Sequence, residues 1–209
     1  MILSNIKTSR IPNRVNLVFS DHSYLPFFID DIVKLSLVKN SEIDSEKLNL
    51  IIATSLKYLG REYTLRQIAI SPKSEKILSQ KLKQYFFRSI QKFKLFSDFP
   101  VSPIINEIIS ELKSKNLLNQ SDFASYFVKK NKNKSQAQVK YLLHQQGINF
   151  DVSTLDDQSA IKKILAKKNV TREIIADFRL KNKLYASLFR SGFQISDIKA
   201  AIDDYLQLK

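Results

Sequence analysis

The sequence is poor in the residues that most catalytic and metal sites require. Its 209 residues include no cysteine, which excludes disulfides, thiolate zinc sites and cysteine nucleophiles. The two histidines, His22 and His144, lie too far apart in sequence for a local metal-binding motif. The three glycines, Gly60, Gly147 and Gly192, are too scattered for a dinucleotide-binding fingerprint or a phosphate-binding loop. We therefore expect a protein without enzymatic activity and without a cofactor.

Long apolar runs are also missing. No stretch approaches the roughly 18 consecutive apolar residues of a membrane-spanning helix. The first residues carry Lys7 and Arg10 among polar ones and lack the apolar centre of a secretory signal. With 44% hydrophobic residues, the chain is apolar enough to fold into one or two domains or an array of small ones. We expect a soluble, intracellular, cytoplasmic protein that does not enter a membrane.

Acidic residues are also scarce. The 20 Asp and Glu are outnumbered by 34 Lys and Arg, which leaves a net charge of +14. From Lys57 to Lys94 only Glu62 and Glu75 oppose a long series of basic residues, and the stretch 129–150 contains no acid. Clustered cations without counterions are typical of phosphate binding, which indicates a polyanionic partner. The alternative, that each lysine is simply a solvent-exposed residue on a helix face, stays open.

The first thirty residues favour β-structure. Three short β-prone runs, 2–7, 14–19 and 24–29, are separated by Pro12-Asn13 and by Asp21-His22-Ser23. Val15, Val18 and Phe19 break strict alternation in the second run, which leaves its buried face poorly defined. We predict an antiparallel hairpin or a three-stranded meander. It must pack on helices or on a partner, because two or three strands are marginal alone.

The remaining sequence has a helical period. Leu48, Ile51 and Ile52 follow a predicted N-cap at Asp44, and Gly60 is expected to bend or interrupt this helix. Further helices are expected to begin at Ser71-Pro72, with Pro72 at the first helical position, and at Ser102-Pro103. The later predicted starts are Asn119 or Ser121, and then positions near Ser135, Thr154, Thr171, Asn182 and Ser196.

One spacing pattern recurs three times. The three sets, each spaced by four residues, are Ser74-Leu78-Leu82-Phe86, Ser135-Val139-Leu143-Gly147 and Leu180-Leu184-Leu188-Gly192. In the last two sets the glycine matches the residue just past a helix end, where a positive φ is needed. We interpret each set as the middle helix of a three-helix unit. Stacked units of this kind would form an elongated, curved molecule.

Several short motifs occur in a characteristic order and together resemble the RecX family of bacterial recombination regulators. The motifs run over essentially the whole chain, as Ser71-Pro72-Lys73-Ser74-Glu75, Leu117–Ala124, Lys134-Ser135, Leu142–Ile148 and Leu188–Phe193. Two positions depart from the family pattern. Ser71 stands where an arginine or lysine is usual, and Phe86 replaces the glycine of the first unit.

The resemblance implies a mainly α fold of three tandem three-helix repeats in an elongated curved rod, preceded by the short β-hairpin or meander. The expected boundaries are 1–40 for the β extension, 41–118 for repeat 1 with an insertion near 87–101, 119–168 for repeat 2 and 169–209 for repeat 3.

The resemblance also implies a function in DNA repair, recombination and the SOS response. By this resemblance, the chain is expected to bind the RecA–ssDNA filament and to inhibit strand exchange, ATP hydrolysis and co-protease activity. It is also expected to be a monomer. Two alternatives stay open. One is a helix-turn-helix-like transcription factor that acts on duplex DNA without RecA, and the other is a structural adaptor that uses the apolar hairpin.

The candidate contact residues are all basic, and no catalytic or metal-binding residue is proposed. They are expected to meet acidic groups of RecA or exposed phosphate. Ser74 and Ser135 are interpreted as helix caps rather than ligands, because a serine oxygen there accepts an otherwise unpaired N–H. Tyr126, Phe127, Tyr141 and Phe193 either stack on bases or pack in the core. The candidates are Arg14, Lys73, Lys129, Lys130, Lys132, Lys134, Lys140, Lys181, Lys183 and Arg190.

Overall fold

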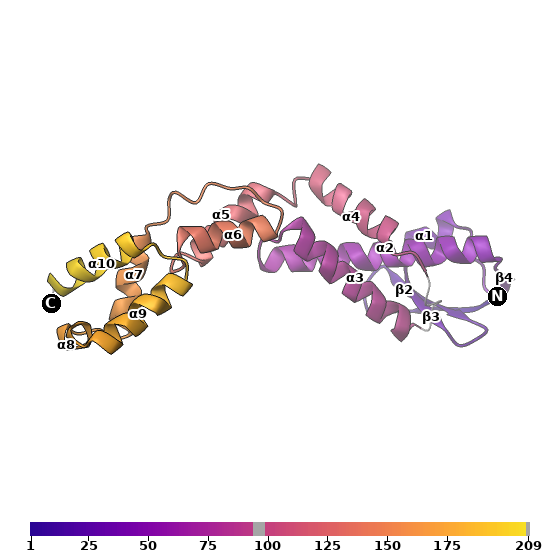
Figure 1. The fold of residues 1–209 in the computed structure, drawn as a ribbon. Helices are drawn as coiled ribbons and strands as arrows, with labels where there is room; N and C mark the ends of the chain where they lie inside the picture. The colour runs from indigo at the N-terminus through magenta and orange to yellow at the C-terminus, as the bar shows by residue number, and fades with distance from the viewer. Residues whose placement is uncertain (94–98, 208–209) are drawn as a thin grey trace. The chain divides into compact units, whose positions relative to one another are not determined.

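The computed structural model describes residues 1–93 and 99–207, in two compact units. Unit 1 spans Met1–Asn119 and unit 2 spans Gln120–Lys209. Part of the predicted insertion near 87–101, and Lys94 within it, lies outside the described residues. No helix in the described residues has the length and apolar character to cross a membrane. The elements of both units are labelled in Figure 1.

Unit 1 begins with the predicted meander, which is confirmed. Strands β1 (Ile2–Thr8), β2 (Arg14–Phe19) and β3 (Tyr24–Phe28) pair antiparallel, and a two-residue strand β4 (Ser41–Glu42) extends the sheet to the order β3-β2-β1-β4. A short helix α1 (Ile29–Lys34) follows β3. The expected loss of alternation in β2 is wrong, because Val15, Leu17 and Phe19 alternate on one buried face.

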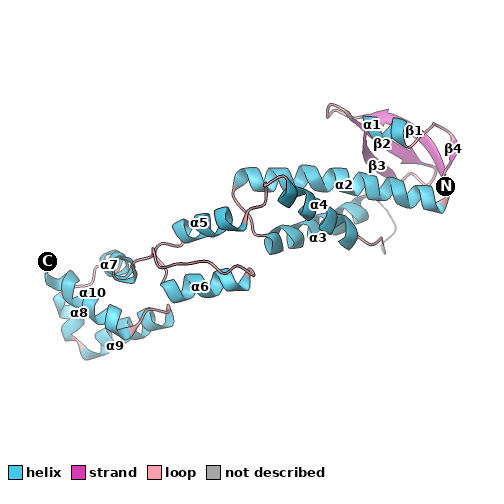
Figure 2. Cartoon of the chain, turned by 90° about the horizontal axis from the view of Figure 1, so that it is seen from above, coloured by secondary structure: helices cyan, strands magenta, loops and turns pink. Residues whose placement is uncertain are grey.

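Three longer helices complete unit 1, in which one helix contacts the sheet and the other two pack against that helix (Figure 2). They are α2 (Ser45–Ile70), α3 (Glu75–Lys92) and α4 (Ser102–Ser114). The Asp44 side chain caps α2 by accepting a hydrogen bond from the Lys47 N–H at 2.7 Å, as predicted. Leu3 and Phe19 from the sheet share one buried core with Ile52 of α2 and Phe86 of α3.

Two expectations about helix boundaries in unit 1 are wrong. Gly60 does not interrupt α2, which is continuous from Ser45 to Ile70. A Cβ there would lie 2.6 Å from atoms of both Phe86 and Ile108, so the glycine allows α3 and α4 to approach α2 closely. Pro72 is not the first residue of a helix, because α3 begins at Glu75. The Ser74 Oγ accepts the Ile77 N–H at 3.2 Å, so capping rather than proline fixes this start.

Unit 2 contains six helices in its described residues. Those residues form α5 (Gln120–Lys130), α6 (Gln136–Gln145), α7 (Asp157–Lys167), α8 (Arg172–Ala176), α9 (Phe178–Arg190) and α10 (Ile195–Gln207). The cap predicted at Ser135 and the helix start predicted near Thr171 are confirmed. The start predicted near Thr154 lies close to the observed cap of α7 at Asp156, whereas the start predicted near Asn182 is wrong, because Asp177 caps α9.

The three predicted middle helices are α3, α6 and α9. Gly147 and Gly192 follow α6 and α9 with φ of +74° and +85°, which confirms both glycines as helix-ending residues. Leu180 departs from the pattern, since it is 46% exposed. Helix α7 contacts α10 and shares one core with α8, α9 and α10. This packing does not establish three equivalent units, so the three-repeat rod stays a prediction.

Candidate nucleic-acid and filament interface

Three cations of unit 1 are paired with carboxylates from α4. Lys57 forms an ion pair with Glu107, and Arg61 Nε donates to Glu111 Oε2 at 2.6 Å. Glu111 also accepts from Lys115 Nζ at 2.7 Å. These hydrogen bonds, first that of Lys115, hold the pKa of the Glu111 carboxyl below its usual value. Carboxylates from outside the stretch Lys57–Lys94 therefore add to Glu62 and Glu75 in opposing its cations.

Arg14 and Lys73, the two candidates in unit 1, both have neighbours within the fold. The Arg14 side chain is 14% exposed and lies 3.9 Å from Glu62. The Tyr58 hydroxyl donates to the same carboxylate at 3.1 Å. Lys73 is half-buried between α2 and α3, and its Nζ donates to the Ser71 carbonyl oxygen at 3.2 Å. Both cations thus have structural contacts that compete with a partner's anions.

Four candidates lie together at the end of α5 and in the turn that leads to α6. We call Lys129, Lys130, Lys132 and Lys134 the basic turn. Lys129, Lys130 and Lys132 are exposed and Lys134 is half-buried. Within residues 1–93 and 99–207, none of the four has a carboxylate at ion-pair distance. The basic turn therefore presents cations that are available to an external anion.

The backbone of the basic turn is fixed by local hydrogen bonds. The Asn131 side-chain amide donates to the Phe127 carbonyl oxygen at 2.8 Å, and the Lys134 N–H donates to the Asn131 carbonyl oxygen at 2.8 Å. Lys130 Nζ lies 5.8 Å from the centroid of the Tyr126 ring, within cation–π range. The turn thus holds its lysines on an ordered backbone.

The aromatic side chains considered for base stacking divide between core and surface. Phe127 is half-buried and its ring lies 5.7 Å from that of Phe123, which is 3% exposed. Tyr126 is half-buried on the same helix. Tyr141 is 62% exposed on α6, where its hydroxyl oxygen accepts from Gln145 Nε2 at 2.7 Å. Of these rings, Tyr141 is the one most available to a base.

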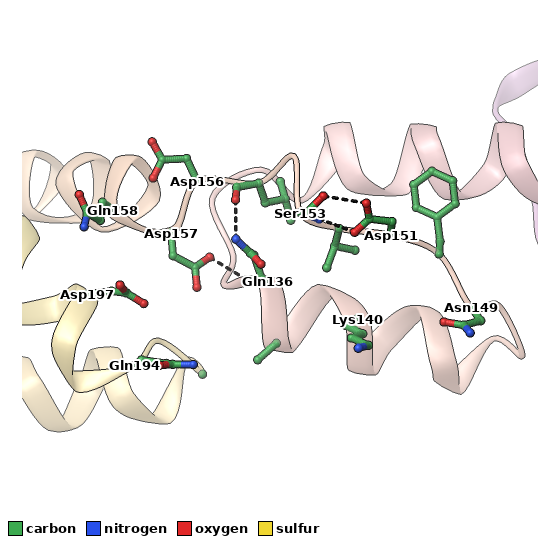
Figure 3. A pocket seen from close by; sticks show the side chains of 15 residues that line it. Gln136, Lys140, Asn149, Asp151, Ser153, Asp156, Asp157, Gln158, Gln194 and Asp197 are labelled. Atoms are coloured by element: carbon green, nitrogen blue, oxygen red, sulfur yellow. Dashed lines mark hydrogen bonds between the residues drawn. The ribbon is translucent and has the colours of Figure 1, made fainter.

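Lys140 lines a pocket whose other charged side chains are acidic. The pocket has a volume of about 940 Å³ and lies between α6, the loop before α7 and the start of α10 (Figure 3). Its carboxylates are Asp151, Asp156, Asp157 and Asp197. Four carboxylates repel phosphate, so this pocket does not favour a nucleic-acid backbone. The described part of the chain contains no group of three His, Cys, Asp or Glu arranged to hold a metal ion.

The pocket carboxylates differ in their environments. Asp157 Oδ1 accepts the Gln136 N–H at 2.8 Å, but burial, together with the charges of Asp197 and Asp156, raises the pKa of Asp157. The pKa of Asp151 is lowered, chiefly by the hydrogen bond from the Ser153 hydroxyl. These contacts tie α6 to the start of α7.

Three candidates lie on α9 in unit 2. Lys181 Nζ lies 5.9 Å from the centroid of the Tyr185 ring, whereas Lys183 and Arg190 line a pocket of about 400 Å³. Lys168, which sequence reasoning did not select, lines the same pocket. It lies far from α9 in sequence, so no local pattern indicated it. The pairing of α2 with α4 did leave a sequence signal, because Lys57 and Arg61 share the four-residue spacing of Glu107 and Glu111.

Comparison with known proteins agrees with the motif order. No family model matches the chain. The chain is 28% identical to the regulatory protein RecX of Clostridioides difficile (strain 630), over 94% of this chain and 92% of that protein. It is 29% identical to the regulatory protein RecX of Clostridium botulinum (strain Eklund 17B / Type B), over 96% and 93%. The resemblance to the RecX family is confirmed.

Two solved RecX structures share the fold. A regulatory protein RecX matches with a TM-score of 0.56 at 18% identity, over 97% of this chain and all of that one. RecX from Lactobacillus salivarius matches with a TM-score of 0.51 at 20% identity, over 72% of this chain and 96% of that one. The RecX likeness thus extends from the N-terminal sheet to the C-terminal helices.

Proposed function

We propose that this chain is a non-enzymatic regulator that binds the RecA–ssDNA filament and inhibits strand exchange, ATP hydrolysis and co-protease activity. The similarity to proteins named regulatory protein RecX over nearly the whole chain supports the partner. The basic turn is the observation that carries the contact, because its cations have no carboxylate partners among the described residues.

Inhibition of this kind needs no chemistry. A protein that binds one state of the filament more tightly than another shifts the filament toward the favoured state. Contact with phosphate through lysines releases counterions and supplies affinity without sequence specificity. The stacked three-repeat rod, its domain boundaries, the monomeric state and the cytoplasmic location belong to the same proposal.

The candidate residues take different places in this proposal. The basic turn meets ssDNA phosphate or acidic groups of RecA, and Lys181, Lys183 and Arg190 add to this charge from α9. Arg14, Lys73 and Lys140 are proposed as weaker contributors, since Glu62, Ser71 and the acidic pocket respectively lie beside them.

The test measures RecA ATPase and strand exchange with sub-stoichiometric protein, and binding to filament, ssDNA and duplex across a salt series. If about six cations neutralise single-strand phosphates, log affinity falls with log salt at a slope of about −4. The variant K129E/K130E/K132E removes three contacts, so we expect weaker inhibition and a slope reduced by about 2. The matched control is K163E/K167E/K199E, which changes three exposed lysines on α7 and α10.

Equal effects of the two triple variants would contradict the role of the basic turn. Tight duplex binding with no effect on RecA would support the transcription-factor alternative instead. Strong inhibition with no salt dependence would assign the contact to uncharged protein surfaces.

A further inference from the structure

Helix α9 exposes an apolar and basic stripe beside its core-facing side. Leu184 and Leu188 are 7% and 2% exposed and belong to the core of unit 2. Leu180, Lys183 and Arg190 lie on the adjoining stripe, with Leu180 46% exposed. Lys183 and Arg190 are seven residues apart, which places them two turns, about 10 Å, apart along the helix axis.

The facing wall of this groove comes from the end of α7 and from α8. Val170 lies in the linker between the two helices and is 2% exposed, and Ile174 lies on α8. Lys168, at the end of α7, adds a third cation to the lining. We call this pocket of about 400 Å³ the α9 groove. Figure 1 shows α7, α8 and α9 gathered at the C-terminal part of the chain.

All charged residues that line the α9 groove are basic. No carboxylate lines it, and within the described residues Lys168, Lys183 and Arg190 form no ion pair. Arg190 Nε donates to the Ala186 carbonyl oxygen at 3.2 Å, which leaves other guanidinium N–H groups for a ligand. Asp177, which caps α9, accepts the N–H groups of Arg179 and Leu180. The groove therefore complements an anion.

The shape and lining favour a peptide over a nucleic acid. The apolar lining is aliphatic, from valine, isoleucine and leucine, and no aromatic ring contributes to it. Nucleobases bind on aromatic platforms, whereas aliphatic grooves accept the side chains of an amphipathic helix. We propose that the α9 groove binds an acidic, amphipathic peptide segment of a protein partner. Two carboxylates, one heptad apart, pair with Lys183 and Arg190, and leucine-like side chains between them fill the groove.

This inference goes beyond the proposed function, because it gives Lys183 and Arg190 a peptide ligand that need be neither RecA nor DNA. It uses none of the lysines of the basic turn. The test uses the full chain labelled with ¹⁵N and a synthetic helical peptide with Glu at positions i and i+7 and Leu at i+3 and i+4. The control peptide has Gln in place of Glu. Amide chemical shifts locate binding, and fluorescence anisotropy of the labelled peptide gives its affinity.

We expect the acidic peptide to shift the amide signals of Val170, Leu180 and Leu184 and to bind at least tenfold more tightly than the Gln peptide. The charge-reversal variant K183E/R190E should weaken binding at least tenfold. The control K163E/K199E, which changes exposed lysines outside the groove, should leave the affinity within twofold. Leu180→Asp tests the apolar contact separately, at a position that is not part of the core.

Three results would overturn the proposal. The first is the absence of shifts at millimolar peptide. The second is a larger response of the same amides to an oligo-dT strand, which would make the groove a nucleic-acid site. The third is concentration-dependent self-association that protects these amides in the free protein, which would make a second copy the occupant. Loss of RecA inhibition in K129E/K130E/K132E without any change in peptide affinity would show that the two sites are separate.

Discussion

At the scale of single residues, Ser135 and Gly192 form a contact that joins two helical segments of unit 2. The Ser135 Oγ accepts the Gln138 N–H at 3.1 Å and donates to the Ser191 carbonyl oxygen at 2.8 Å. A Cβ on Gly192 would lie 2.6 Å from that same Oγ. The serine therefore caps its own helix and also fixes the turn after α9, which only glycine fits.

Gly192→Ala is expected to cost more stability than Gly147→Ala. Both glycines have a positive φ, which costs an alanine about 1–2 kcal/mol. A Cβ at Gly147 meets no atom within 4 Å, so the stability lost in Gly147→Ala is limited to the cost of the positive φ. At Gly192 the close contact between the new Cβ and Ser135 Oγ should cost about 1 kcal/mol or more in addition, which is typical of overpacking. Urea unfolding of both variants checks the order, and equal losses would contradict the contact.

Asp157→Asn tests the raised pKa of this carboxyl. A folded-state pKa above the unfolded value means that the stabilising contribution exists at low pH and is lost as pH rises through the folded pKa. Asparagine keeps an acceptor for the Gln136 N–H and removes the repulsion from Asp156 and Asp197. We expect the free energy of unfolding at pH 7 to rise by up to about 1 kcal/mol. Part of this gain is offset, because asparagine loses the favourable interaction of the carboxylate with the α7 dipole.

The gain from Asp157→Asn should disappear near pH 3, where the aspartate is protonated in both states. Thermal unfolding at the two pH values measures it, with Asp203→Asn on the exposed side of α10 as control. A variant that is less stable than the parent at pH 7 but not at pH 3 would show that the carboxylate charge stabilises the site.

At the scale of elements, α2 and α4 are joined by ion pairs with matching four-residue spacing. Lys57 and Arg61 on α2 meet Glu107 and Glu111 on α4, and Lys113 of α4 pairs with Glu75 of α3. These contacts neutralise charge in unit 1, whereas the basic turn in unit 2 lacks such partners among the described residues. Pairing between elements thus makes some cations of unit 1 less available to a partner than their place in the sequence suggests.

Glu111→Gln should destabilise unit 1 by about 0.5–1 kcal/mol at pH 7 and low salt, as expected for a largely surface-exposed network. Because the pKa of Glu111 is lowered, its contribution exists above the unfolded pKa and is lost as pH falls through the folded value. The effect should therefore vanish at low pH and shrink in 1 M salt. Chemical denaturation measures it, with exposed Glu42→Gln as control. A loss that persists at low pH would show that packing, not charge, is responsible.

At the scale of the whole molecule, the chain is divided between two separate cores. One core extends from Leu3 to Leu118 and the other from Ala160 to Ile202, so neither crosses the boundary after Asn119. Each unit has a size typical of independently folding domains. Most candidate contacts lie in unit 2, which holds the basic turn and the α9 groove, whereas Arg14 and Lys73 lie in unit 1.

Fragments 1–119 and 120–209 are each expected to fold alone, because each retains its own core. Circular dichroism and cooperative urea unfolding measure this. A fragment of residues 1–74 serves as control, since it lacks α3 and α4 and leaves Ile52 and Leu56 without their packing partners. A disordered 120–209 fragment would contradict the independence of unit 2.

The sequence by itself determined the features that depend on near neighbours. Caps at Asp44, Ser74 and Ser135, the helix-ending glycines and the N-terminal meander were all predicted, because each is fixed by hydrogen bonds or periodicity within a few residues. The cationic stretch of the basic turn was also evident, since it is contiguous.

Only the tertiary structure decided the features that join distant segments. Gly60 permits close helix packing instead of breaking α2, and Glu107 neutralises Lys57 across fifty positions. Lys168 reaches the α9 groove from another helix. Such contacts depend on how elements pack, and a one-dimensional pattern does not record which faces meet.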